Sequence, residues 1–488
     1  TPVGATAINS VSGAKSKTNA EIFVVGQTVK EHTLEMIRNY YGRHMSHLKI
    51  ARKFLAQLLV ENKADSKLFD HYNRITDRYE IGDGKKTAKE LYDSIDEKIP
   101  DYFEMWHSYV YKSRQSSTWS GIVMAVLKGK SEDMSIENLA DVASILSECK
   151  DVYSAEVPLA IKRLAKLIAD SDIKDRFLDE PAKQCALLLK SSDNKEISAE
   201  FAQFMERHGH RGIREAEFLE KSWLQDPSDL MQTLKMIVKQ GKFEEHTKSH
   251  KTVDEIVESL KTPLSHFKRL ILKSFLVEKA MKGVCSRELG KSVCIKFSNV
   301  FKQAYWKLAD FMVRESRLPD PKLLFFLTHS EIGTLLENRS ANLIRLAKRR
   351  MRVYQKMNET SFSKINIGLP EPIRKIDQIG SSSVSILQGM PVCRGKAKGR
   401  ACVIKVLEDA HQIEEGDVLV CRYTDVGWSP YFPLISGLVT ELGGLLSHGA
   451  VVARECGIPC IVNTPGATDL VKTGDIVLLD GTAGTFSK

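Results

Sequence analysis

The stretch that decides the fold of the C-terminal region reads TELGGLLSHGAVVARE and spans residues 440–455. A short run of Leu, Val and Thr that is typical of a strand comes before it, and Gly443 and Gly444 then turn the chain. A helix is predicted over 449–456, where small and apolar residues follow His448. The pattern therefore places one histidine at the beginning of a helix, after a strand and a glycine turn.

A histidine in this position has the properties of a phosphoryl carrier. Neutral imidazole is a good nucleophile near pH 7, and a covalent intermediate divides one difficult transfer into two easier ones. The first N–H groups of a helix bind phosphate oxygens, and Gly443, Gly444 and Gly449 have no side chain to keep phosphate away. The Ser447 hydroxyl is expected to bond the phosphate or to orient the ring. We predict that His448 is catalytic, although this short pattern also fits a structural histidine.

A longer pattern around the motif resembles a known family. Residues 443–454 and the following Ile458-Pro459 resemble the phosphorylation-site signature of the phosphoenolpyruvate-utilising enzymes. Segments on either side also resemble the swivelling histidine domain of that family, at 387–395, 399–400, 416–420, 424–430, 437–441 and 480–485. The resemblance implies that His448 is phosphorylated, and that Arg454 helps to support the phosphate.

The rest of the chain has a different pattern. Residues 30–357 are mainly amphipathic helices, which we expect over 34–58, 137–149, 155–170, 196–208, 253–283, 287–314 and 330–357. A segment rich in Pro, Gly and Ser at 364–385 is the expected linker. Beyond it, short runs rich in Val, Ile and Leu predict strands at 401–406, 417–422, 436–440, 459–463 and 475–480.

These patterns predict a multidomain protein, with a large all-α domain followed by a small α/β swivelling phosphohistidine domain. We expect the helical domain over residues 1–375 and the phosphohistidine domain over residues 376–488. This order is similar to that of the rifampicin phosphotransferases, so the helical domain is expected to bind the acceptor.

The helical part contains two further candidate motifs. Residues 209–212, which read Gly-His-Arg-Gly, resemble an element of the same family. Within it, His210 and Arg211 are expected either to belong to the site or to support a helix end together with Glu215. Similar matches occur at Leu324–Thr328 and Glu331.

A basic pair stands on one predicted helix. Arg287 and Lys291 are four residues apart and therefore share a helix face. They fall where the family has a basic pair facing the acceptor, which implies that they hold the transferred phosphate. The alternative is an exposed basic face beside Glu288.

The resemblance implies a phosphotransferase, or kinase, that needs another domain for its donor. No glycine-rich nucleotide loop with its lysine occurs before residue 130. ATP and Mg²⁺ are therefore expected to bind outside this chain, on an ATP-grasp domain that lies upstream in a longer protein or in a separate one. His448 is then expected to pass the phosphoryl group to a small-molecule hydroxyl acceptor.

Two alternatives remain. One is a non-catalytic relative that keeps the fold for binding or interaction. The other is a phosphoenolpyruvate synthase-type activity. Against the latter stand the given sequence, in which no segment is expected to form the pyruvate-binding barrel of those enzymes, and Leu446, which occupies the position of a regulatory threonine in the related dikinases.

Composition limits the other possibilities. The 488 residues are 42% hydrophobic and 27% charged, which is typical of a soluble globular protein, and we expect no membrane partner. The net charge is +9, but residues 385–488 contain nine Lys and Arg against eleven Asp and Glu, so the basic excess lies upstream. We find no nucleic-acid-binding motif. Nine irregularly spaced cysteines predict neither a disulfide framework nor a metal site, and favour the cytoplasm.

Overall fold

The computed structural model describes residues 63–128, 134–149, 152–241, 243, 251–358, 386–405, 407–445 and 447–488. Four sequence expectations lie outside these described residues: the helix over 34–58, the linker over 364–385, the domain boundary at 375/376 and any role of Leu446. The chain divides into two compact units, and each is considered separately.

The first unit comprises residues 1–111, 216–219 and 296–382, and its described part is helical. Aromatic rings pack in its interior: the Phe301 ring lies 5.7 Å from that of Phe297 and 5.0 Å from that of Tyr102. Its elements are α5 (Lys63–Ile75), η1 (Thr76–Arg78), the first part of α6 (Ala88–Lys128), the last part of α15 (Val277–Arg314), η3 (Pro321–Phe326), α16 (His329–Asn338) and α17 (Ala341–Asn358).

Capping residues set the limits of α16. The Thr328 hydroxyl accepts a hydrogen bond from the Glu331 amide at 3.2 Å, and the Glu331 carboxylate accepts one from the Thr328 amide at 2.8 Å. At the other end, Arg339 takes a left-handed conformation with φ of 48° and stops the helix. The single helix predicted over 330–357 is therefore two helices, α16 and α17.

The longest helices differ most from the prediction. α6 has 41 residues and contains Pro100, and no helix was predicted over most of its length. The helix predicted over 253–283 is interrupted, since Pro263 disfavours helical geometry in the residue before it. From His266, helical structure continues to Arg314, so the gap predicted near residue 285 does not exist.

The second unit comprises residues 112–215, 220–295 and 383–488. Side-chain caps begin several of its helices; for example, the Asn194 side chain accepts a hydrogen bond from the Glu196 amide at 3.1 Å. Besides parts of α6 and α15, its helices are α7 (Ile136–Ser147), α8 (Tyr153–Ala169), α9 (Lys174–Asp179), α10 (Ala182–Lys190), α11 (Lys195–His208), α12 (Ser228–Gln240), α13 (Val253–Glu258), α14 (His266–Ile271) and the π-helical η2 (Leu272–Leu276).

An eight-stranded mixed sheet forms the C-terminal part of this unit, in the order β1-β8-β7-β3-β4-β5-β6-β2. Strands β3 to β6 are parallel neighbours, and the other pairings are antiparallel. The strands are β1 (Ile386–Gln388), β2 (Met390–Cys393), β3 (Lys396–Ile404), β4 (Val418–Cys421), β5 (Gly437–Thr440), β6 (Cys460–Val462), β7 (Ile476–Asp480) and β8 (Thr485–Ser487). Among them lie η4 (Leu407–Gln412), η5 (Val426–Leu434), α18 (His448–Glu455) and α19 (Ala467–Leu470).

The predicted fold class is confirmed, because a large helical region is followed by a small mixed α/β domain. All five predicted strands are present, and all residues of β4 and β5 are buried, as expected for central parallel strands. The prediction missed β1, β2 and β8, which have only three or four residues each.

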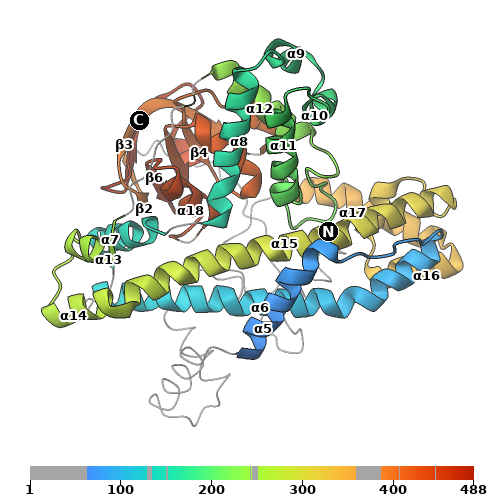
Figure 1. The fold of residues 1–488 in the computed structure, drawn as a ribbon, viewed down its shortest axis with the longest axis horizontal. Helices are drawn as coiled ribbons and strands as arrows, with labels where there is room; N and C mark the ends of the chain where they lie inside the picture. Colours follow the sequence, from blue (N-terminus) through green and yellow to red (C-terminus); the bar gives the residue numbers. More distant parts are fainter. Residues whose placement is uncertain are drawn as a thin grey trace, which may run out of the picture. The chain divides into compact units, whose positions relative to one another are not determined.

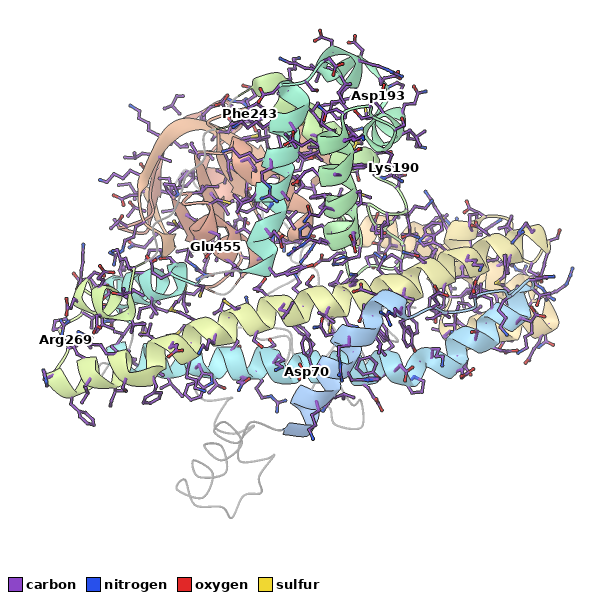
Figure 2. All side chains as sticks on the ribbon, viewed as in Figure 1. Asp70, Lys190, Asp193, Phe243, Arg269 and Glu455 are labelled. Carbon is purple, nitrogen blue, oxygen red and sulfur yellow. The ribbon has the colours of Figure 1, made fainter. Side chains whose placement is uncertain are left out.

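The α/β domain and the helices of the second unit share one hydrophobic core. This core includes Val157 and Leu234 from α8 and α12, and Phe432 and Leu438 from η5 and β5. Helix α8 packs against η5. Helix α18 packs against β2 and β6 (Figure 1). Figure 2 draws the side chains and labels Glu455, which is the last residue of α18.

No helix in the described part of the chain combines the length and the apolar character that a bilayer crossing requires.

Candidate functional site

The backbone after β5 places His448 at the first residue of α18. The amides of Glu441 and Leu442 donate to the carbonyl oxygens of Cys421 and Arg422 at 3.1 and 2.8 Å, which extends the contact between β4 and β5. The chain then turns, and the Ser447 amide donates to the Gly444 carbonyl at 2.9 Å.

Gly443 and Gly449 are required by this geometry for different reasons. Gly443 has φ of 146°, and a Cβ on it would lie 3.1 Å from the Ser447 Oγ. A Cβ on Gly449 would collide with the Thr424 hydroxyl. Gly444, in contrast, has open space where a Cβ would lie. The two glycines of the turn are therefore not equivalent, which the sequence pattern did not reveal.

The His448 ring is hydrogen-bonded by a residue that lies outside its own sequence motif. Its Nε2 lies 3.1 Å from the hydroxyl oxygen of Ser429, a buried residue of η5. Its Nδ1 has no hydrogen-bond partner among the described residues. Ser447, which we expected to orient the ring, is the N-cap residue of α18 but makes no side-chain capping bond. Ser429 was not predicted, because it is 19 residues from His448 and no local spacing connects the two.

A buried carboxylate, Glu215, joins two cations close to the histidine. Its Oε1 lies 3.1 Å from Lys291 Nζ, and its Oε2 accepts a hydrogen bond from Arg211 Nη1 at 3.2 Å. Burial alone would raise the pKa of Glu215, but the charges of Lys291 and Arg211 outweigh burial and lower it. Glu215 is therefore ionised, and the three groups together carry one net positive charge.

These surroundings keep the His448 ring neutral. Burial lowers its pKa first and the Lys291 ammonium lowers it further, to about 3, while Glu288 and Glu215 act in the opposite direction. At pH 7 the ring therefore has a lone pair available on one nitrogen. A neutral imidazole beside a cationic cluster can act as a nucleophile toward an anionic phosphoryl group.

The predicted basic pair is divided between two carboxylates. Arg287 donates to its neighbour Glu288 through Nε at 3.1 Å and Nη2 at 2.5 Å, whereas Lys291 pairs with Glu215. Arg287 is mostly buried, with 12% of its side chain exposed, and Lys291 has 30% exposed. Neither side chain is mainly exposed, although Arg287 does pair with Glu288 as in the alternative interpretation, and Lys291 is the member whose charge acts on His448.

His210 and Arg211, the two central residues of the Gly-His-Arg-Gly element, are buried. His210 Nε2 lies 3.4 Å from the Ser292 hydroxyl, and the Arg211 guanidinium pairs with Glu215 and lies over the Tyr153 ring at 5.6 Å. Arg211 is therefore brought to the cluster around His448, whereas His210 is bonded to the neighbouring helix α15.

Arg454 is placed away from the phosphate position. It lies near the end of α18, six positions after His448, which corresponds to about 9 Å along the helix axis. Its side chain is buried, and Cys149 and Cys393 are among the groups that act on it. The structure thus does not bring Arg454 to the helix mouth.

Asp425 also approaches the cluster. Burial and the nearby Glu215 carboxylate raise its pKa. It accepts a hydrogen bond from the Gly427 amide at 2.9 Å and another from the backbone of Arg214. The described residues contain no group of three or more His, Cys, Asp or Glu side chains suited to a metal ion.

Two family models match parts of this chain. A model described as the fourth domain of rifampicin phosphotransferase covers residues 106–288, and one described as the mobile domain of PEP-utilising enzymes covers residues 413–484. The first contains Arg211 and Glu215, and the second contains Ser429 and His448.

Individual relatives support both matches. The rifampicin phosphotransferase of Bacillus cereus is 30% identical over 326 residues, which are 64% of this chain and 36% of that protein. The prodigiosin synthesizing transferase PigC of Serratia marcescens is 27% identical over 358 residues, 70% of this chain and 39% of that protein. The phosphoenolpyruvate synthase of Aeropyrum pernix is 44% identical over 100 residues, 20% of this chain and 12% of that protein. The chain spans little more than a third of the rifampicin phosphotransferases it matches.

Proposed function

The chain belongs to the phosphoenolpyruvate-utilising enzymes, and on this premise we propose that His448 carries a phosphoryl group from a donor to a hydroxyl acceptor. The observation that carries the proposal is the state of the His448 ring. It is neutral at pH 7, it is held by Ser429, and the charge of Lys291 acts on it.

In the first transfer, a ring nitrogen of His448 attacks the phosphorus atom of the donor. The new N–P bond forms as the P–O bond to the leaving group breaks, so the ring must be unprotonated at the attacking nitrogen. The low pKa of His448 meets this requirement throughout the neutral pH range.

In the second transfer, the acceptor hydroxyl attacks the phosphorus atom and the N–P bond breaks. The phosphoryl oxygens need cationic support at this stage, and Lys291 can exchange its contact with Glu215 for one with the phosphate. Glu215 would then remain paired with Arg211 and would not be left as an isolated buried charge.

The donor in this proposal is ATP, with Mg²⁺ neutralising its phosphates. An ATP-grasp domain, either in a longer form of this protein or in a partner, would bind both. The phosphoryl group on His448 would be the β-phosphate. Breakage of the bond to AMP would leave the β- and γ-phosphates on the ring, and water would then cleave the bond between them and release phosphate. The acceptor would bind beside α15, where Lys291 lies.

A synthase-type activity receives less support than phosphotransfer to a bound hydroxyl compound. The likeness to the Aeropyrum phosphoenolpyruvate synthase covers only 20% of this chain, whereas the rifampicin phosphotransferase model extends over residues 106–288 of the helical region. The helical match therefore favours an acceptor held by helices.

The test supplies the missing donor. The chain is mixed with the ATP-grasp domain of a rifampicin phosphotransferase, Mg²⁺ and ATP labelled in its β-phosphate. We expect acid-labile, base-stable label on the chain, no label on His448→Ala, and full label on His266→Ala, which changes an exposed histidine. Equal labelling of the His448→Ala chain would contradict the proposal.

A further inference from the structure

One ion pair joins the C-terminal α/β domain to the helical part of the second unit. Arg394 follows β2, and its Nη2 lies 3.1 Å from the Asp141 Oδ1 on α7. Both residues belong to the same compact unit. The sequence pattern did not indicate that Arg394 and Asp141 are partners.

The Asp141 carboxylate is satisfied even without Arg394. It is fully buried and accepts hydrogen bonds from the Lys261 amide at 3.2 Å, the Thr262 amide at 2.7 Å and the Thr262 hydroxyl at 2.7 Å. Arg394 is different, because 34% of its side chain is exposed to solvent. Separation of the two would therefore return Arg394 to water and leave Asp141 hydrogen-bonded, which avoids the large cost of an uncompensated buried charge.

The surrounding interface is apolar. Helix α7 packs against β2, and the buried side chains of Val392 and Ile145 belong to the same hydrophobic core. Apolar burial drives association but is not directional, whereas a hydrogen-bonded ion pair fixes one relative orientation. The Arg394–Asp141 pair is thus a directional element of the contact between α7 and β2.

We propose that Arg394 and Asp141 are positioning residues, which hold the α/β domain against α7 so that His448 faces Lys291 and Glu215. The role of the Arg394–Asp141 pair rests on the proposed function, in which the α/β domain must face the acceptor during the second transfer. The pair opens when the domain leaves to collect phosphate and forms again on its return.

The accessibility of Cys149 measures whether the domain is docked. This buried thiol follows α7, and Arg454 and Glu455 of α18 are among the charged groups that act on it. Cys294 is a suitable internal reference, because it is buried in α15 and is not among the residues of the core that the α/β domain shares with the helices. Undocking exposes Cys149 alone, whereas unfolding exposes both thiols.

The experiment measures the rates of maleimide modification of Cys149 and Cys294, mapped by mass spectrometry, in the chain without ATP or acceptor. In Arg394→Gln we expect Cys149 to react about tenfold faster, the factor typical of a lost charged hydrogen bond, and Cys294 to react at the wild-type rate. Arg400→Gln is the matched control, because Arg400 makes its bonds to Asp417, at 2.9 and 2.7 Å, within the α/β domain. It should leave the Cys149 rate unchanged.

An unchanged Cys149 rate in Arg394→Gln would overturn the proposal. If both thiols of that variant react faster, the fold itself has weakened, and Arg394→Met, which removes the charge but keeps the length of the side chain, then decides: faster reaction of Cys149 alone supports the proposal, and a wild-type rate overturns it. Because the measurement uses no phosphoryl donor, its outcome is independent of whether His448 is phosphorylated. A second measurement uses the chain that carries the labelled phosphoryl group. In this chain, Arg394→Gln should slow the transfer of the phosphoryl group to an acceptor without slowing its loading.

Discussion

The pKa of His448 falls to about 3 because burial penalises the charged ring and Lys291 adds a repulsive charge. A histidine with the ordinary pKa of about 6.5 would be partly protonated at neutral and mildly acidic pH. The sequence motif predicted the identity and the position of this residue at the start of α18. It did not predict the protonation state, because Lys291 and Glu215 lie far from His448 along the chain.

The first prediction concerns the effect of Lys291 on this pKa. Lys291→Met removes the cation while keeping a side chain of similar length, so we expect the pKa of His448 to rise. NMR titration of the ring protons should show protonation beginning at a higher pH than in the wild type.

The control for this prediction is Lys282→Met. Lys282 also lies on α15, but its side chain is 71% exposed and pairs with Glu278, so its removal should leave the titration of His448 close to the wild-type curve. A Lys291→Met titration that coincides with the wild-type curve would show that Lys291 does not act on the ring.

At the scale of elements, the strand–turn–helix unit from β5 to α18 could be predicted because its signals are local. Short apolar strands, adjacent glycines and a helix start occur in direct succession over residues 437–455. The helical part was predicted less well. Pro100 was compatible with a 41-residue helix, whereas Pro263 accompanied a break, after which the Ser265 side chain caps the start of α14.

The second prediction separates the two glycines of the turn. Gly443→Ala introduces a Cβ at φ of 146° and within 3.1 Å of the Ser447 hydroxyl, so it should lower the free energy of unfolding by about 1–3 kcal/mol. Gly444→Ala meets open space and has no positive φ, so its effect should stay within about 0.5 kcal/mol. Urea unfolding followed by circular dichroism measures both, and equal losses for the two variants would contradict the geometry of the turn.

At the scale of the molecule, the α/β domain does more than carry His448. Its core is continuous with that of α8 and α12, so docking against the helices buries apolar surface as well as forming the Arg394–Asp141 pair. The sequence predicted a swivelling domain that follows a linker over 364–385. The shared core is a tertiary feature that no local pattern contains, and it stabilises the arrangement in which the α/β domain packs on these helices.

The whole account depends on one covalent bond, between phosphorus and the ring of His448. Tandem mass spectrometry of the wild-type chain, after incubation with an ATP-grasp domain, Mg²⁺ and ATP, locates that bond directly when the peptides are kept at alkaline pH. The account predicts one phosphoryl group on the peptide that contains His448, attached to the histidine itself. A phosphoryl group on Ser447, Ser429 or any other residue, with His448 unmodified, would contradict it.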